Sequence, residues 1–245
     1  MKWQLGEVVE LTMETETVST LAFRLPAWRG HQAGQHVDIR LTAEDGYQAQ
    51  RSYSIASPPE DPRLALTVER LDDGEVSPYL VGEVMVGDRL ELRGPIGGYF
   101  VWNAAREPER PVLLVGGGSG VVPLMAMIRH RQASRSRTPM RLLYSSRSLQ
   151  DVIYKPELDA LAAPADGLAI HHTLTRSHPP DWRGYARRID REMLGEVSWP
   201  ARDRPAVFVC GPTSFVETAA VLLLELGYDA SWIKTERFGA TGGPA

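Results

Sequence analysis

The chain has little that could bind a metal or form a disulfide. Among its 245 residues there is one cysteine, Cys210, and the six histidines include no H-x-x-x-H pair. One thiol cannot form an internal disulfide or supply the ligands of a cysteine-bound zinc or iron–sulfur site. His171 and His172 are adjacent, so on a strand their side chains would point to opposite faces. We therefore predict no metal site.

The sequence also lacks a basic excess and long apolar runs. Its net charge is -4, whereas nucleic-acid binders usually carry a basic face, so nucleic acid is not an expected partner. No apolar run approaches the roughly 20 residues of a membrane helix, and the opening MKWQLGEVVE lacks the apolar core of a signal peptide. With 43% hydrophobic and 24% charged residues, the composition predicts a cytoplasmic globular protein with no membrane span.

The first half of the chain has the pattern of a small antiparallel β-barrel. Short alternating runs are separated by Gly, Pro, Asp and Asn turns, a spacing typical of all-β domains rather than of βαβ units. One short helix is expected, with Ser77 as its N-cap and Pro78 at its first position. Residues 1–103 are assigned to this domain, with predicted strands Glu7–Thr12, Val18–Arg24, His36–Leu41, Gln50–Ser54, Leu64–Arg70 and Arg89–Leu92.

A four-residue segment, Arg51 to Ser54, is the first candidate binding element. On a strand, Arg51 and Tyr53 share one face while Ser52 and Ser54 lie on the other. A guanidinium pairs with phosphate, an aromatic ring stacks on an aromatic cofactor, and a hydroxyl bonds a ring heteroatom. A half-exposed strand with a solvated arginine would explain the same residues.

The turn Gly74-Glu75-Val76-Ser77 shifts the balance toward a cofactor. It places a glycine and a hydroxyl at a helix start, where free N–H groups can receive phosphate. An ordinary N-capped helix would account for it equally well.

The second half changes to alternating strands and helices, which predicts a parallel sheet covered on both faces in residues 110–245. Ligands of such sheets bind at the carboxyl ends of the strands. That rule selects the glycine-rich turn Gly116–Gly120 together with Ser145–Arg147, Thr175–Arg176 and Cys210–Pro212. The predicted strands are Pro111–Val115, Met140–Ser145, Leu168–Thr173, Ala206–Cys210 and Ala230–Lys234, and the predicted helices are Val121–Arg131, Lys155–Ala162, Arg191–Leu194 and Phe215–Leu226. The last of these helices carries a capping-box pattern at Ser214 and Glu217.

Three motifs of the first half resemble the flavin domain of the ferredoxin–NADP reductase superfamily: Arg51-x-Tyr53-Ser54, Gly74-x-x-Ser77 and the segment from Gly94 to Phe100, GPIGGYF. The resemblance implies that Arg51 meets the flavin pyrophosphate, Tyr53 packs on the isoalloxazine and Ser54 bonds its edge. It also implies flavin contacts from Gly74, Val76 and Ser77 at the pyrophosphate, and from Val68 and Arg70 on a neighbouring strand.

The second half is similar to the same family's nucleotide domain. Gly118-Ser119-Gly120 followed by Pro123 matches its G-x-G-x-x-P motif, which differs from the G-x-G-x-x-G of dehydrogenases. Cys210-Gly211-Pro212 matches its C-G-P motif, whose thiol lies by the nicotinamide, and Glu236 with Phe238 and Gly239 is close to its terminal E-x-F-G. The implied catalytic residues are Ser54, Cys210 and Glu236, with Cys210 shaping the nicotinamide pocket rather than acting as a nucleophile.

The resemblance implies an FAD-dependent NAD(P)H reductase, with hydride passing from the nicotinamide to the flavin. Ser145, Arg147, Thr175 and Arg176 fall where relatives hold a 2′-phosphate, so NADPH is expected to be preferred over NADH. Because the chain has no cysteines for a plant-type [2Fe–2S] cluster, we expect a separate electron acceptor, such as a ferredoxin-like protein or an oxygenase component. Alternatives are an NAD(P)H:flavin or quinone reductase with small-molecule acceptors, and a non-catalytic flavin-binding subunit of a larger complex.

Overall fold

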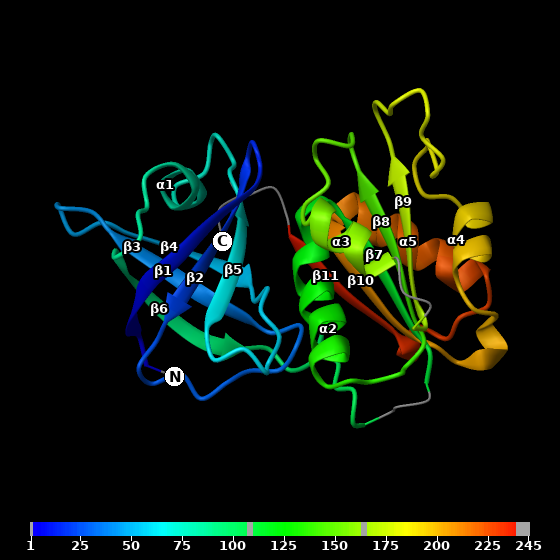
Figure 1. The fold of residues 1–245 in the computed structure, drawn as a ribbon, viewed down its shortest axis with the longest axis horizontal. Coiled ribbons are helices and arrows are strands. Elements are labelled where there is room, and N and C mark those ends of the chain that lie inside the picture. The colour runs from blue at the N-terminus through cyan, green and yellow to red at the C-terminus, as the bar shows by residue number, and fades with distance from the viewer. Residues whose placement is uncertain (1, 107–109, 163–165, 239–245) are drawn as a thin grey trace. The chain divides into compact units, whose positions relative to one another are not determined.

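The computed structural model describes residues 2–106, 110–162 and 166–238. Its chain divides into two compact units (Figure 1). Of the described residues, the first unit comprises those up to Asn103 together with Met125–Ser134, and the second comprises those of Ala104–Leu124 and those from Arg135 to Phe238. Part of one helix, α2 (Val121–Ala133), therefore belongs to the first unit by its contacts. Residues 107–109 of the predicted connection lie outside the described residues.

The first unit contains a six-stranded antiparallel sheet in the order β4-β3-β6-β1-β2-β5. An isolated antiparallel bridge between Ile55 and Leu66 links the end of β4 to β5, and a backbone bond from Ala56 N–H to Ala65 O of 2.8 Å supports it. The outermost strands therefore meet, and the predicted antiparallel barrel is confirmed. Its strands are β1 (Gln4–Thr15), β2 (Val18–Arg24), β3 (His36–Thr42), β4 (Gln48–Ser54), β5 (Leu64–Glu69) and β6 (Arg89–Ile96).

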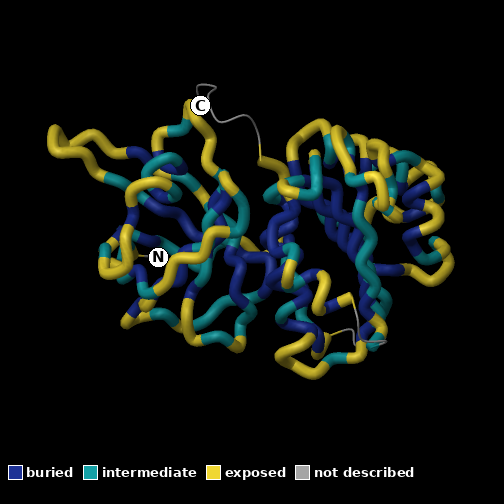
Figure 2. Tube along the Cα trace, turned by 45° about the horizontal axis from the view of Figure 1, so that its top comes forward, coloured by how far each residue is buried: buried dark blue, intermediate teal, exposed yellow. Residues whose placement is uncertain are grey.

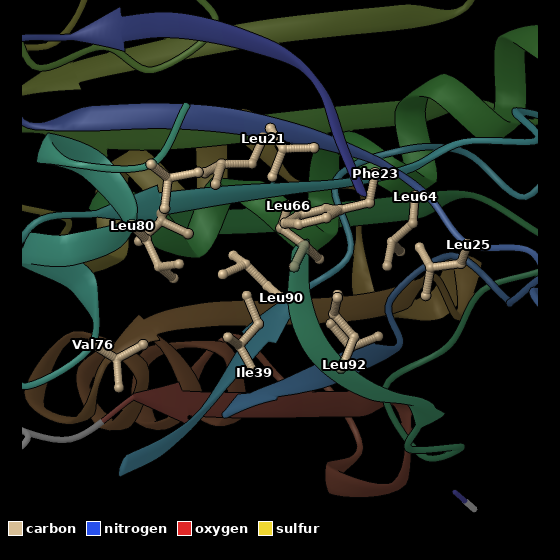
Figure 3. Packing of buried hydrophobic residues seen from close by; sticks show 14 of the residues in the cluster. Leu21, Phe23, Leu25, Ile39, Leu64, Leu66, Val76, Leu80, Leu90 and Leu92 are labelled. Carbon is tan, nitrogen blue, oxygen red and sulfur yellow. The ribbon is translucent and has the colours of Figure 1, made fainter. Parts of the chain in front are cut away.

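The barrel is filled by one apolar cluster to which the strands contribute alternate residues. Leu21 and Phe23 of β2 and Leu64 and Leu66 of β5 have no exposed surface, and Figure 3 shows them pointing into a common interior. Burying a side chain of this size contributes about 1.5–3 kcal/mol, so this interior is the main source of the barrel's stability. Helix α1 (Ser77–Gly82) adds Leu80 to the same cluster.

The start of α1 differs from the prediction. Val76 is the N-cap, without a side-chain capping bond, and Ser77 is already helical. The Ser77 hydroxyl instead accepts a hydrogen bond from Leu71 N–H at 3.1 Å, which closes the loop that precedes the helix. The Val76 side chain is fully buried.

The second unit contains a five-stranded parallel sheet, as predicted, and its strands lie in the order β11-β10-β7-β8-β9. Its strands are β7 (Val112–Gly117), β8 (Met140–Ser146), β9 (Leu168–Leu174), β10 (Ala206–Pro212) and β11 (Ile233–Phe238). The helices are α2, α3 (Lys155–Ala162), α4 (Arg191–Val197) and α5 (Thr213–Glu225), with 3-10 helices at Gly118–Gly120, Ala201–Asp203 and Ala230–Trp232. Figure 2 shows that the central strands are buried. Among the described residues, no helix has the length and apolarity needed to cross a bilayer.

Two elements of this unit start at least two residues away from their predicted starts. The last strand begins at Ile233 rather than at Ala230, because the Asp229 carboxylate accepts a bond from Ser231 N–H at 2.8 Å and starts a short 3-10 helix. Helix α5 begins at Thr213, with Pro212 as N-cap and no side-chain capping bond. The capping box predicted from Ser214 is therefore not formed.

The order of the strands produces a switch point between β7 and β10. From β7 the chain adds β8 and β9 on one side, and then crosses to add β10 and β11 on the other. Helices α2 and α3 lie on one face of the sheet and α4 and α5 on the other (Figure 1). The turns that follow β7 and β10 therefore leave the sheet in opposite directions and open the kind of crevice where doubly wound sheets bind ligands.

Candidate cofactor-binding sites

The register of β4 settles which way the candidate flavin residues face. Arg51 pairs with Ile39 and Tyr53 with Val37 across β3 and β4, and both β3 partners are fully buried core residues. Tyr53 packs against that core, and burial raises the pKa of its hydroxyl. Arg51 lies two residues before Tyr53, so the two side chains leave the same face of β4, as the alternation predicted.

Ser54 lies on the opposite face of the same strand. It pairs with His36, and its neighbour on that face, Ser52, donates a hydrogen bond to the Asp38 carboxylate at 2.6 Å. Asp38 also receives the Arg93 guanidinium at 2.7 Å. Burial lowers the pKa of His36.

A compact loop holds the second group of candidate flavin residues. Gly74 N–H donates to Leu71 O at 2.8 Å, and a Cβ on Gly74 would come within 2.9 Å of the Ser77 hydroxyl oxygen. The loop therefore closes tightly on itself at Gly74, where any side chain would press on the Ser77 hydroxyl. The Val76 side chain is fully buried, so its backbone is the part that a ligand could contact.

The two remaining candidates of this unit are placed differently from each other. Val68 has no exposed surface and packs inside the barrel cluster. Arg70 follows β5, and its guanidinium lies 3.3 Å from the exposed Asp72 carboxylate. Any contact of Val68 with a ligand would be through its backbone, whereas Arg70 has an accessible side chain.

One charged residue that sequence reasoning missed lies between the two groups. The Glu75 carboxylate receives the Arg51 guanidinium at 2.5 Å and the Tyr47 hydroxyl at 2.5 Å. The Tyr47 hydroxyl and the Arg51 guanidinium hold the pKa of Glu75 below its usual value. The only sequence signal was its place inside the Gly74–Ser77 turn.

The crevice of the second unit is formed by backbone that approaches backbone very closely. A Cβ on Gly120 would lie 2.2 Å from the Cys210 carbonyl oxygen, so no other residue fits there. Gly118 has φ +55, a conformation that favours glycine, and a Cβ there would meet nothing within 4 Å. The turn is thus tight against β10 at Gly120 and open at Gly118.

An aromatic ring fixes the other side of the same crevice. A Cβ on Gly117 would lie 2.9 Å from the Phe215 ring, and a Cβ on Gly211 would lie 2.8 Å from it. The ring of Phe215, in the first turn of α5, is therefore in contact with the ends of both β7 and β10. This explains the glycines on each strand end in packing terms.

Cys210 and Glu236 are neighbours in the parallel register of β10 and β11. Cys210 is fully buried; burial raises the pKa of its thiol, and the Glu236 carboxylate raises it further. Burial also raises the pKa of Glu236 from its usual 4.5 to about 7. Phe238 at the end of β11 is 37% exposed, and Gly239 lies outside the described residues.

Basic and hydroxyl side chains come together at the ends of β8 and β9. Thr175 N–H donates to Ser146 O at 3.0 Å and Arg176 N–H to Arg147 O at 2.9 Å, so the two segments run side by side. Arg147 and Arg176 are both exposed, and within the described ranges neither guanidinium has an ion-pair partner. Ser145 is buried beside them.

Sequence comparisons identify two domains in the same order. The oxidoreductase FAD-binding domain matches residues 6–101, and the oxidoreductase NAD-binding domain matches residues 114–220. Ferredoxin–NADP reductase B of Sorangium cellulosum is 34% identical over 218 residues, which is 84% of this chain and 85% of that protein. The chain belongs to the ferredoxin–NADP reductase family. The predicted family and its FAD and pyridine-nucleotide domains are confirmed.

Other family members match over nearly the whole chain. The glycine betaine monooxygenase reductase subunit of Pseudomonas aeruginosa is 32% identical over 241 residues, covering 97% of this chain and 64% of the relative. This chain thus spans less than two thirds of that relative's length. Among solved structures, the flavohem-like FAD/NAD binding domain of nitric oxide dioxygenase from Vibrio cholerae superimposes with a TM-score of 0.85 at 28% identity, covering 96% of this chain and 98% of that one.

Proposed function

We propose that the protein is an FAD-dependent NAD(P)H reductase that delivers electrons to a separate acceptor. The observation that carries the proposal is the switch point of the second unit, where the Gly118–Gly120 turn, Cys210 and Glu236 come together. The FAD-binding barrel that precedes it in the chain supplies the other half. When bound, FAD would accept a hydride from the reduced nicotinamide and release the electrons to the acceptor.

In this proposal the first unit holds FAD through residues that suit its parts. The Arg51 guanidinium binds the pyrophosphate with the backbone of the Gly74–Ser77 turn, where the cradle is too narrow for a Cβ. Tyr53 presents a ring fixed by the barrel core, which limits the entropy lost on stacking. Ser54 offers a hydroxyl from the opposite face of β4 for the edge of the ring. Arg70 would add a charge, and Val68 and Val76 would add backbone contacts.

The second unit would hold the pyridine nucleotide at the start of α2. The open turn at Gly118 and Ser119 lets a pyrophosphate reach backbone N–H groups and the positive end of the helix. Gly120 and Pro123 shape the turn, and Gly211 and Pro212 continue the wall at the end of β10. The buried Cys210 thiol stays protonated, so its role is to fill space and exclude water rather than to attack.

Glu236 would take part as a proton-holding group. Because the pKa of its carboxyl is about 7, it can gain or lose a proton near neutral pH, as a general acid or base requires. Phe238, two residues along the same strand and partly exposed, would cover the aromatic part of the site.

The proposal includes a preference for NADPH over NADH. Arg147 and Arg176 have exposed guanidinium groups beside Ser145 and Thr175, and this combination can hold a 2′-phosphate. Arg187 is less available, because Asp190 and Glu192 bind it at 2.5 Å and 3.0 Å. The ratio of kcat/KM for the two nucleotides tests this; a ratio that favours NADH would contradict it.

The acceptor is proposed from the relatives. The reductase subunit of glycine betaine monooxygenase is named for an oxygenase, and the Sorangium relative for a ferredoxin. We therefore propose a ferredoxin-like protein or an oxygenase component as the partner, and a cytoplasmic location, because a single free thiol suits a reducing compartment.

The decisive test is an absorbance spectrum of the purified protein, followed by anaerobic addition of NADPH. A flavin spectrum that bleaches within seconds supports the proposal. Absence of flavin, with failure to take up added FAD, would contradict it. Rapid transfer to free flavin or quinones but to no one-electron protein acceptor would favour the small-molecule reductase instead.

A further inference from the structure

The Glu75 carboxylate is held from two sides by residues of β4 and its hairpin. Its Oε2 accepts from the Arg51 guanidinium and its Oε1 from the Tyr47 hydroxyl, both at 2.5 Å. Tyr47 belongs to the β3–β4 hairpin, whose turn is fixed by Ala43 N–H donating to Tyr47 O at 2.8 Å. Both oxygens of one carboxylate are thus engaged, which fixes its position beside Arg51.

The Glu75 carboxylate binds the Arg51 guanidinium, which is the group that the proposed function assigns to the flavin pyrophosphate. Arg51 has one guanidinium, and its other hydrogen bond goes to the Gln50 carbonyl oxygen at 2.8 Å. Glu75 also sits inside the Gly74–Ser77 turn, so a pyrophosphate bound there would have a fixed negative charge as an immediate neighbour. Neighbouring negative charges repel each other, and the Glu75 carboxylate and the pyrophosphate would both compete for the Arg51 guanidinium.

The structure also provides space into which the Glu75 side chain could turn. A cavity of about 520 Å³ lies among β3, α1 and β6, and Glu75 and Tyr47 are part of its wall. Arg89 lines the same cavity, is exposed, and has no ion-pair partner among the residues that the structure describes. A carboxylate released from Arg51 therefore has an unpaired cation within its own cavity.

We propose that Glu75 is an internal competitor for the flavin phosphate, and that it weakens flavin retention by occupying Arg51. This inference rests on the proposed function. It assigns Glu75 the role of setting how firmly the cofactor is held, with Tyr47 positioning the carboxylate. The protein would then release flavin more readily than its Arg51 and glycine turn alone would allow.

The test compares FAD retention by the parent protein and by Glu75→Gln, measured as the rise in flavin fluorescence when the holoprotein is diluted to equilibrium. Glutamine keeps the size of the side chain and removes the charge. Because exposed ion pairs contribute little, the Kd for FAD should fall only modestly, by about fivefold. Tyr47→Phe should lower the Kd for FAD by less, because the Glu75 carboxylate still pairs with Arg51 and loses only the hydrogen bond from the Tyr47 hydroxyl.

Two controls separate competition from a general loss of negative charge. Asp73→Asn removes a carboxylate two residues away that has no ion-pair partner among the described residues, and it should leave the Kd nearly unchanged. Riboflavin carries the flavin ring but no phosphate, so Glu75→Gln should not tighten its binding.

The outcomes distinguish the inference from the function beneath it. If the parent and Glu75→Gln both fail to bind FAD, the proposed function is wrong and the inference falls with it. If both bind FAD equally, or the variant binds it more weakly, the reductase function stands and Glu75 is not a competitor. A riboflavin affinity that rises as much as the FAD affinity would also overturn the inference.

Discussion

Replacing Glu236 by glutamine should stabilise the protein, and the gain should grow with pH. The folded protein raises the pKa of this carboxyl from 4.5 to about 7 through burial. Between these values the folded state keeps a proton that the unfolded state has released. The stability that Glu236 contributes in this way is therefore fully present below its unfolded pKa of 4.5. It is lost as pH rises through its folded pKa of about 7. Glutamine cannot ionise, so the variant avoids that loss.

The size of the effect follows from the shift. A change of one unit in pKa corresponds to about 1.4 kcal/mol, so the shift of Glu236 amounts to at most about 3 kcal/mol, since part of the side chain remains in solvent. Roughly 1 kcal/mol of this is already lost at about pH 5.5. The stability difference between variant and parent should therefore grow by about 2 kcal/mol from about pH 5.5 to about pH 8.5.

The assay is urea denaturation of the parent and Glu236→Gln across that range, with Glu217→Gln as the matched charge control. Glu217 is an exposed carboxylate on α5 of the same unit, so the variant makes the same chemical change at the surface. If the difference between Glu236→Gln and the parent stays constant with pH, burial does not control this carboxyl and the proton-holding role assigned to Glu236 is lost.

Three further outcomes are expected. Gly120→Ala should lower the free energy of unfolding by about 3 kcal/mol and abolish nucleotide binding, because its Cβ would lie 2.2 Å from a backbone oxygen. Gly118→Ala has open space around its Cβ and should lower the free energy of unfolding by only about 1–2 kcal/mol. Urea denaturation and nucleotide titration measure both effects. Cys210 should resist a thiol reagent at neutral pH in the folded protein and react once the protein is unfolded, because it is fully buried and the pKa of its thiol is raised. Arg176→Ala should raise the KM for NADPH about tenfold and leave the KM for NADH nearly unchanged, since only the 2′-phosphate contact is removed.

Local patterns in the sequence predicted the elements well where the hydrophobic period was clear. The strand Val18–Arg24 and the helix Lys155–Ala162 have the bounds that the structure gives. Four barrel strands, β1, β3, β4 and β6, run longer than predicted, as at β1 (Gln4–Thr15). Pairing with neighbouring strands extends them through polar residues whose own preference for strand is weak.

Helix caps and the partners of charged side chains were harder to predict, because several side chains can compete for the same partner. The Ser77 hydroxyl was expected to cap α1 but bonds Leu71 N–H instead, while Asp190, which was not singled out, caps α4 by accepting from Met193 N–H at 2.8 Å. Glu75 was visible inside its turn, but its partner Tyr47 lies 28 residues earlier in the chain. No local pattern encodes a side-chain contact between a hairpin and a loop across that separation.

Glu75 and Glu236 show how one side-chain type can take opposite roles in the two units. Glu75 is exposed and bound by a hydroxyl and a guanidinium, which lowers the pKa of its carboxyl and fixes a negative charge beside Arg51. Glu236 is mostly buried beside a neutral thiol, which raises the pKa of its carboxyl to about 7. Hydrogen bonding to the charged form dominates in the first case and desolvation in the second. The barrel therefore carries a permanent charge that can oppose a bound phosphate, whereas the parallel sheet carries a group whose charge changes near neutral pH. The surroundings of each carboxyl group, and not its residue type, therefore determine its role.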